Sequence, residues 1–236
     1  MTKVGDIIEA DNAGWHFGGA ASRHFDQHAR RSIPHYETCH ELTLALSDFF
    51  VGDGSVIYDL GCATGTLLTG LAARHLAKQP RLLGLDVEAD MVAIARERNA
   101  AQPLIEILQA DLTDYELERC DLIVACYTVQ FVPPRARQQV FDRLYAALNW
   151  GGALILFEKV RAPDARFQDI MSTLYHDYKL TQGYSGDEIL AKARALKGVL
   201  EPFSREGNLG LMQRAGFVDI MTVFKYVCFE GFLAIK

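Results

Sequence analysis

The sequence predicts an α/β protein with a Rossmann-like, doubly wound and mostly parallel sheet of seven strands. Between about 36 and 160, short apolar runs alternate with helical stretches, as in βαβ units whose strands are buried on both faces. A glycine-containing turn joins the first of these strands to its helix. Two apolar runs near the end of the chain, 218–224 and 227–235, indicate an antiparallel hairpin at one edge of the sheet.

The individual elements of the core follow from hydrophobic period and from turn residues. Short runs rich in β-branched residues and leucine predict strands at 56–60, 81–86, 105–109, 120–127 and 153–158. Apolar residues at helical spacing predict helices at 37–50, 66–77, 91–99 and 134–148. A further helix is expected to end with Met212 to Ala215, just before Gly216.

We expect a single domain of four segments. Residues 1–35 mix glycine, histidine and polar residues and predict an arm, irregular or helical, that can serve as a lid. Residues 36–160 form the core, 161–210 a helical insertion after the fifth strand, and 211–236 the closing helix end and strands. The stretch 187–200 is amphipathic, which suits either packing within the subunit or a dimer interface.

Composition limits the class of protein. The chain has 236 residues, 50% of them hydrophobic and 23% charged, which is typical of a folded globular domain. A formal net charge of −6 argues against a protein that binds nucleic acid directly. No leader-like or membrane-spanning apolar run is evident, so we expect a cytoplasmic protein without a membrane partner. The 5 cysteines include no CxxC pair, which predicts reduced thiols and no metal site.

The segment 59–65, Asp-Leu-Gly-Cys-Ala-Thr-Gly, stands where the first core strand meets its helix. Gly61 and Gly65 have no Cβ and therefore let the backbone turn sharply and approach a ligand. Such a ligand lies at the carboxyl ends of parallel strands. Asp86 ends the second strand, where a carboxylate accepts both hydroxyls of a ribose, and Asp111 follows the third, placed to meet an adenine amino group.

Two residues distinguish the kind of nucleotide. Ala63 stands where a dinucleotide-binding GxGxxG turn has its second glycine, and the negative charge of Asp59 would repel a phosphate. A carboxylate at that place suits a cationic amino-acid group instead. The runs DLGCATG at 59–65, LGLDVEADM at 83–91 and QADL at 109–112 resemble the class I S-adenosylmethionine-dependent methyltransferases, which implies S-adenosylmethionine as the cofactor.

A closer resemblance covers nearly the whole chain. The carboxy-S-adenosylmethionine synthases have similar runs to RSIPHY at 31–36, YDLGC at 58–62, TVQF at 128–131, WGGAL at 150–154, HDYK at 176–179 and AGF at 215–217. This resemblance implies a homodimer that converts S-adenosylmethionine and prephenate into a carboxylated sulfonium used in tRNA wobble-uridine modification. It also implies cofactor contacts from Tyr36, Gly61, Cys62, Ala63, Asp86, Val87, Asp111 and Leu112.

Two positions differ from that family's pattern. An asparagine of the family aligns with Cys126, and an arginine that pairs with the carboxylate of the modified sulfonium aligns with Leu211. Leucine offers no donor to a carboxylate in a dry pocket, although Arg205 and Arg214 are near in sequence. We therefore expect an ordinary methyltransferase that acts on a small-molecule acceptor. A carboxy-S-adenosylmethionine synthase and a noncatalytic cofactor-binding subunit are the alternatives.

Methyl transfer requires alignment, a water-poor enclosure and, for some acceptors, a base. His176, Tyr184 and His35 are our candidates for catalytic residues, because histidine titrates near neutral pH and a tyrosine can exchange a proton. His176 has the best context, on an expected helix of the insertion. The enclosure is expected to come from aromatic residues of the arm, or these residues simply fasten the arm to the core: Trp15, Phe17 and Phe25.

Overall fold

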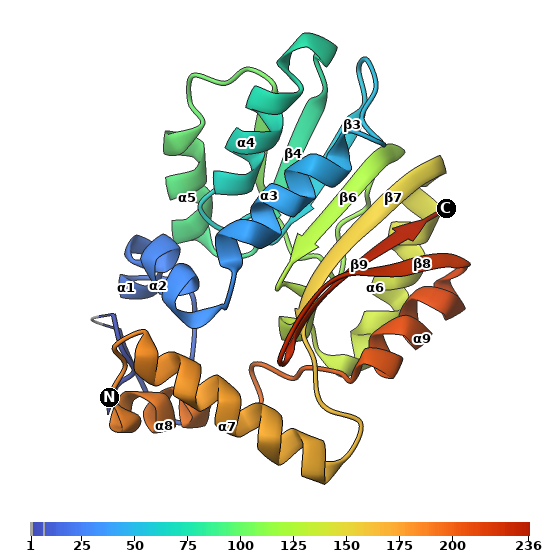
Figure 1. Cartoon of the computed structure of the whole chain (residues 1–236). Helices are drawn as coiled ribbons and strands as arrows, with labels where there is room; N and C mark the ends of the chain where they lie inside the picture. Colours follow the sequence, from blue (N-terminus) through green and yellow to red (C-terminus); the bar gives the residue numbers. More distant parts are fainter. Residues whose placement is uncertain (1, 7) are drawn as a thin grey trace.

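A seven-stranded sheet runs through the molecule in the order β5-β4-β3-β6-β7-β9-β8 (Figure 1). This computed structural model describes residues 2–6 and 8–236. The strands are β3 (Val56–Leu60), β4 (Arg81–Asp86), β5 (Ile105–Gln109), β6 (Cys120–Cys126), β7 (Leu148–Lys159), β8 (Asp219–Tyr226) and β9 (Phe229–Ile235). The first five are parallel, and β9 and β8 are antiparallel, which confirms the predicted fold class.

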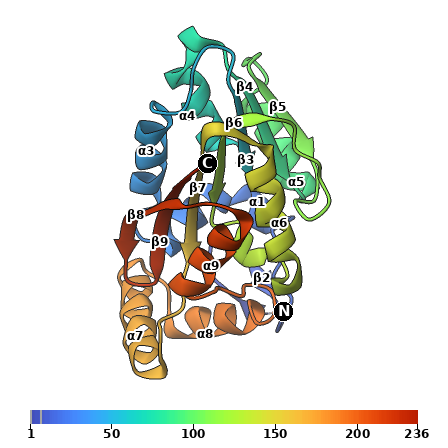
Figure 2. The same cartoon turned by 90° about the vertical axis from the view of Figure 1, so that its right-hand side faces the viewer.

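Helices cover both faces of the sheet (Figure 2). One face packs against α3 (Tyr36–Ser47), α4 (Thr66–Arg74) and α5 (Ala89–Arg98), and the other against α6 (Pro134–Ala147) and α9 (Arg205–Ala215). The central strands β3, β4 and β6 are therefore almost continuously buried, as expected of parallel strands with helices on both sides. Two short 3-10 helices, η1 (Leu76–Lys78) and η2 (Val129–Phe131), complete the connections.

Several elements differ by a few residues from the sequence-based boundaries; the helix expected at 37–50, for example, ends at Ser47. The strand expected to start at 153 begins at Leu148, because Asn149 to Gly152 continue the chain in extended form beyond a bulge opposite Cys120 and Leu122. The helix expected to run to 77 ends at Arg74, and the short turn η1 follows it. Neither of the last two differences moves a strand end that faces the site.

The arm contains a small hairpin and two helices. Its elements are β1 (Thr2–Lys3), β2 (Glu9–Ala10), α1 (Ala20–Arg23) and α2 (Phe25–Ser32). Val4, Ile8 and Trp15 are buried against Ala195, which belongs to the insertion. Burial of these apolar side chains is what holds the start of the chain against a segment about 190 positions further on.

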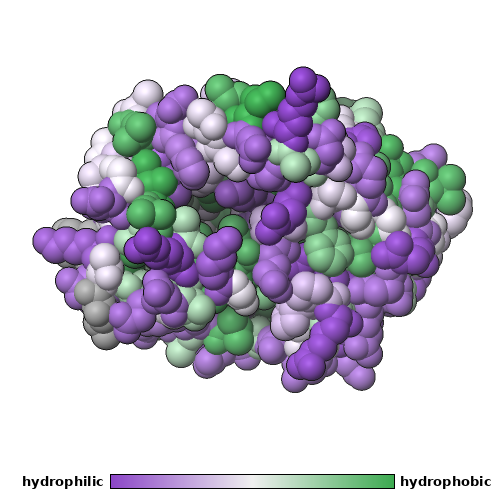
Figure 3. Space-filling model, turned by 90° about the horizontal axis from the view of Figure 1, so that it is seen from below, coloured by the Kyte–Doolittle hydropathy of each residue, from purple (hydrophilic) through white to green (hydrophobic). Residues whose placement is uncertain are grey.

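The insertion consists of α7 (Ala165–Thr181) and α8 (Gly186–Ala195), which cross below the sheet in Figure 1. Asp164 caps α7, and Ser185 with Glu188 forms a capping box at the start of α8. Phe167, Ile170 and Leu174 of α7 are exposed. Seen from below, apolar patches stand among hydrophilic side chains (Figure 3). No helix in residues 2–6 and 8–236 has the length and apolar character of a membrane span.

Candidate functional site

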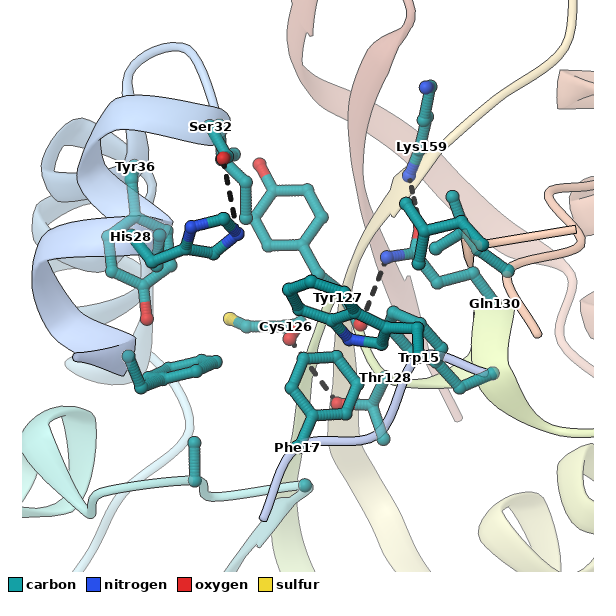
Figure 4. Close-up of a pocket in the computed structure, with 18 of the residues that line it drawn as sticks. Trp15, Phe17, His28, Ser32, Tyr36, Cys126, Tyr127, Thr128, Gln130 and Lys159 are labelled. Carbon is teal, nitrogen blue, oxygen red and sulfur yellow. Dashed lines mark hydrogen bonds between the residues drawn. The ribbon is translucent and has the colours of Figure 1, made fainter. Parts of the chain in front are cut away.

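A cavity of about 450 Å³ lies at the carboxyl ends of the parallel strands. Its walls come from the ends of β3, β4, β5, β6 and β7, and the arm, α7 and α8 close it from outside (Figure 4). A cavity of this size falls in the range of small-molecule sites, roughly 300–1,000 Å³. Such a position is where open α/β sheets bind their ligands.

The turn after β3 brings the backbone to the cavity. Gly61 has a φ of +70°, and a Cβ there would stand 2.4 Å from Oγ1 of Thr128, so only glycine fits. Thr128 itself donates to the carbonyl of Leu60 at 2.7 Å. Gly61, Cys62 and Ala63 line the cavity. Gly65 lies behind the lining and starts α4, where a Cβ would stand 2.6 Å from the amide of Asn99.

Asp59 is the most deeply buried carboxylate of the lining, with 2% of its surface exposed. Burial and then the neighbouring charge of Asp86 raise the pKa of Asp59 to about 7. Among the described residues no side chain or backbone amide donates a hydrogen bond to it. A cationic ligand group placed beside Asp59 would favour its ionised form, so this carboxylate fits the ammonium group of S-adenosylmethionine.

Two further carboxylates stand at the ends of the neighbouring strands. Asp86 follows β4 and accepts hydrogen bonds from the amides of Ala63 at 2.9 Å and Glu88 at 3.0 Å, and burial raises its pKa. Asp111 follows β5, and its Oδ1 accepts hydrogen bonds from the backbone amide and the hydroxyl of Thr113. Val87 and Leu112 line the cavity beside them. The structure thus brings together on one wall the acidic residues that the sequence assigned to ribose and adenine.

The arm forms the opposite wall with aromatic side chains. Trp15, Phe17 and Phe25 of the arm line the cavity together with Tyr36 of α3, and the ring of Phe17 packs edge-on against Phe131 at 5.0 Å. A polar bridge fastens the arm next to the cofactor turn: Arg98 binds Asp26 of α2 at 2.6 Å and the carbonyl of Thr64 at 2.9 Å. The arm therefore covers the cavity in this structure.

Cys126 and Tyr127 form the floor at the end of β6. Figure 4 shows the Cys126 thiol in the space between α3 and β6. Burial raises the pKa of this thiol well above its usual value, so Cys126 is neutral and does not act as a nucleophile. Burial also raises the pKa of the Tyr127 hydroxyl. Cys126 is therefore a small neutral lining residue where the family's pattern has asparagine.

The end of the cavity beneath the insertion is basic. Lys159 at the end of β7, Lys179 on α7 and Lys192 on α8 all line it, together with His176. Lys179 and Lys192 are 6% and 7% exposed. Burial, then the charge of Lys159, lowers the pKa of Lys179 to about 7. Burial and Lys179 likewise lower the pKa of Lys192.

The three candidate catalytic residues lie in different places. His176 lines the basic end of the cavity, and burial followed by the charges of Lys179 and Lys159 lowers its pKa. Tyr184 lies one layer behind the lining and donates to Asp6. His35 is outside the cavity, where its ring packs 4.6 Å from that of Tyr226.

Leu211 lies in the core, away from the cavity where the resemblance implied a carboxylate-binding residue. Leu211 is 3% exposed and packs in the core between α6 and α9, on the face of the sheet opposite α4. It does not line the cavity, so its identity says nothing about how a ligand carboxylate is held there. Arg205 and Arg214 do not reach the cavity either, because they bind Glu230 at 3.0 Å and Gln138 at 2.7 Å.

Sequence reasoning missed Lys179 and Lys192 as site residues. Lys192 had a usable signal, since it falls on the apolar face of the stretch 187–200, in helical register with Ile189 and Leu196. Both of those residues line the cavity, and so do Ala193 and Leu200. The amphipathic face of this stretch thus packs within the subunit against the arm, as one of its two expected explanations has it, and it also lines the site.

Comparisons with known proteins identify the class. The family description "Methyltransferase domain" matches residues 57–152. An S-adenosylmethionine-dependent methyltransferase, SibL, superimposes with a TM-score of 0.62 over 92% of this chain and 57% of its own, at 16% identity. Human N-acetylserotonin methyltransferase in complex with S-adenosylmethionine superimposes with a TM-score of 0.55. The match covers 92% of this chain and 54% of that chain, at 18% sequence identity. These likenesses concern the fold, and together with the acidic wall they define a class I S-adenosylmethionine-dependent enzyme.

Relatives in sequence narrow the class to one family. The carboxy-S-adenosyl-L-methionine synthase of Campylobacter jejuni is 39% identical over 213 residues, which are 90% of each chain. That of Staphylococcus epidermidis is 33% identical over 90% of this chain and 92% of its own. The chain belongs to the carboxy-S-adenosyl-L-methionine synthase family. Our expectation of an ordinary small-molecule methyltransferase is therefore wrong, and its main support, Leu211, lies outside the site.

Proposed function

We propose that this protein is a carboxy-S-adenosylmethionine synthase that takes S-adenosylmethionine and prephenate. One observation in the site carries the proposal: the cavity continues beyond the acidic cofactor wall to a second, basic end under α7 and α8. An enzyme that joins two reactants needs such a second compartment next to the reacting methyl group. The identity to synthases of this name over 90% of the chain supports the same assignment.

The net chemistry adds a carboxyl group to a methyl carbon. S-adenosylmethionine supplies an acidified methyl group on a sulfonium, and prephenate supplies a carboxyl group as its ring becomes aromatic. The proton from the methyl group and the hydroxide from the prephenate ring leave together as water, and phenylpyruvate is the other product. The protein has to hold both reactants, keep bulk water out and fix their relative orientation.

Residues of this chain suit each of those tasks. Asp59, a buried carboxylate of the lining, suits the ammonium group of the cofactor, and Asp86 suits its ribose. Trp15 and Phe17 of the arm line the cavity and exclude water from it. Cys126 lines the cavity and stays neutral because burial raises the pKa of its thiol, so it presents no competing thiolate to the sulfonium.

A mass measurement tests this proposal. The purified protein is incubated with S-adenosylmethionine and prephenate labelled with ¹³C in the ring carboxyl group, then denatured, and the released small molecules are weighed. We expect a sulfonium that is heavier than S-adenosylmethionine by one labelled carboxyl group, with an equal amount of phenylpyruvate. Omitting prephenate is the matched control. Unchanged S-adenosylmethionine, with prephenate left intact, would contradict the proposal.

A further inference from the structure

Three ammonium groups meet at one end of the cavity although they come from three separate elements. Lys159 ends β7, Lys179 lies on the last turn of α7, and Lys192 lies on the last turn of α8. All three line the cavity, and their charges act on one another. Figure 4 shows Lys159 across the cavity from His28 and Tyr36. The basic end is therefore assembled by tertiary structure.

No carboxylate of the described residues is paired directly with the basic end. None of the three lysines forms an ion pair with residues 2–6 or 8–236. The carboxylates of the lining stand at the other end: Asp59, Asp86, Glu88 and Asp111. The charge of Asp6 acts on Lys192, but Asp6 lies behind the lining and is bound by His28, Arg31 and Tyr184.

These ammonium groups retain donors for a ligand. Lys192 uses two of its three N–H donors on His28 and, at 3.2 Å, on Ser32. Lys159 and Lys179 have no hydrogen-bond acceptor among the described residues. Each instead stands over the ring of Tyr175, at 4.3 and 4.8 Å from its centroid. Buried cations without an acceptor destabilise a fold unless a ligand completes their surroundings.

The surface between the lysines is aromatic and apolar. The ring of Tyr175 packs edge-on against Phe229 at 5.3 Å, and both line the cavity. Ile189 and Leu196 of α8 add an aliphatic wall. Such a surface accepts the flat carbon frame of a cyclic ligand, and the surrounding ammonium groups accept charges at its ends.

We infer that Lys159, Lys179 and Lys192 form a subsite for a cyclic dicarboxylate, with Tyr175 against its ring. This inference rests on the proposed function, in which the dicarboxylate is prephenate. Two carboxylates match three ammonium groups better than one does, because a single carboxylate leaves two of these buried groups uncompensated and a dicarboxylate leaves one. The cavity then has an acidic end for the sulfonium reactant and a basic end for the dianion, which also orients both.

Binding measured without turnover tests this subsite. The protein is saturated with S-adenosylhomocysteine, which lacks the methyl group, and prephenate is titrated in by calorimetry. We compare the wild type with Lys159→Met, Lys179→Met and Lys192→Met, and with Lys197→Met as the matched control, because Lys197 is exposed and outside the lining. Each of the first three is expected to weaken prephenate binding about ten- to a hundredfold, and the control to leave it unchanged.

Two further measurements separate binding from damage to the fold. Affinity for S-adenosylhomocysteine should stay within about threefold in every variant, and Lys179→Arg, which keeps the charge, should retain most of the prephenate affinity. Phenylpyruvate, which has one carboxylate, should bind at least about tenfold more weakly than prephenate. Prephenate affinity that is unchanged in all three methionine variants, or absent in the wild type, overturns the subsite.

The same variants distinguish this inference from the proposed function. Lysine-dependent prephenate binding without any carboxylated sulfonium would leave the subsite standing and contradict the synthase proposal. Conversely, product formation that is as efficient in the methionine variants as in the wild type would support the synthase proposal and contradict the subsite.

Discussion

His28 donates through Nδ1 to the Asp6 carboxylate at 2.5 Å, and this bond joins the start of the chain to the wall of the cavity. The side chain of Asp6 is 1% exposed and also accepts from Arg31 and Tyr184. These donors, opposing the effect of burial, lower the pKa of Asp6. One carboxylate thus holds three segments, the hairpin of the arm, α2 and the α7–α8 turn, in one arrangement.

Removing that charge should loosen the arm. We expect Asp6→Asn to lower the free energy of unfolding by about 1–3 kcal/mol, because charge-assisted hydrogen bonds to His28 and Arg31 are lost. Urea unfolding followed by circular dichroism measures this. Asp53→Asn, in an exposed turn, is the control and should be neutral. Equal stability of the two variants would show that Asp6 does not fasten the arm.

His28 should make stability depend on pH. Burial, followed by the charge of Lys192, lowers the pKa of His28 from 6.5 to about 4. The folded protein therefore favours neutral imidazole, so its contribution is complete above about pH 6.5 and is lost as pH falls toward 4. The contribution is at most about 3 kcal/mol.

Melting temperatures at pH 7.5 and pH 4.5 measure this effect. We expect His28→Gln to lose less stability than the wild type over this interval. Part of the dependence should persist in that variant, because burial also lowers the pKa of His40 to about 4. Subtracting the change in melting temperature of His28→Gln from that of the wild type removes the contributions that both proteins share. A variant with the full wild-type dependence would exclude His28 as its source.

Asp86 should determine cofactor affinity. We expect Asp86→Ala to weaken S-adenosylmethionine binding by about 1–3 kcal/mol through lost charge-assisted hydrogen bonds. Isothermal titration calorimetry measures this change in binding affinity. Since Asp86 also holds the amides of Ala63 and Glu88, Asp86→Asn serves as a second variant that retains one acceptor oxygen. The surface change Glu116→Gln is the control, and an affinity for Asp86→Ala equal to that of the control would remove Asp86 from the ribose role.

Cys126 is the position where the lining differs from the family's pattern. Cys126→Asn replaces a neutral thiol with an amide that has two donors, and its side chain can reach a ligand because Cys126 lines the cavity. We expect the variant to bind carboxy-S-adenosylmethionine about three- to tenfold more tightly than the wild type, with little change for S-adenosylmethionine. Equal gains for both ligands would place the amide away from the carboxyl group.

Leu211 provides a test of the corrected alignment argument. Leu211→Arg buries an unpaired charge in the core between α6 and α9, so we expect a loss of stability above about 3 kcal/mol. Leu211→Met keeps the apolar volume and should cost less than about 1.5 kcal/mol. A stable Leu211→Arg protein with improved binding of carboxylated ligand would contradict the placement of this residue.

The acidic residues at the strand ends could be predicted from the sequence. That Lys159, Lys179 and Lys192 come together at one end of the cavity could not. Asp59, Asp86 and Asp111 each follow an apolar run, and parallel strands carry such residues to one edge. Lys159 ends a strand in the same way, directly after Glu158. The structure separates this pair, since Lys159 lines the cavity and Glu158 is buried, where it accepts from the amide of Val129 at 3.0 Å.

Positions of residues outside the parallel units depend on packing of distant segments. Tyr184 and His35 have the residue types of a base, but only the docking of the arm decides which side they face. Leu211 was assigned from alignment, and its helical register against α6 could not be read from a single sequence. Period and turn residues fix local structure, whereas such orientations require contacts at long sequence separation.

The contact between the arm and α8 has a consequence for biosynthesis. Trp15 donates its backbone amide to the carbonyl of Ala195 at 3.2 Å, so the two partners leave the ribosome far apart in time. The β-α units of the core can form while the arm still lacks its partner, and its apolar residues are exposed during that interval. A nascent chain released before α8 is made would also lack β8 and β9, so it would expose the edge of β7 and the apolar side chains of the arm and would have no enclosed cavity.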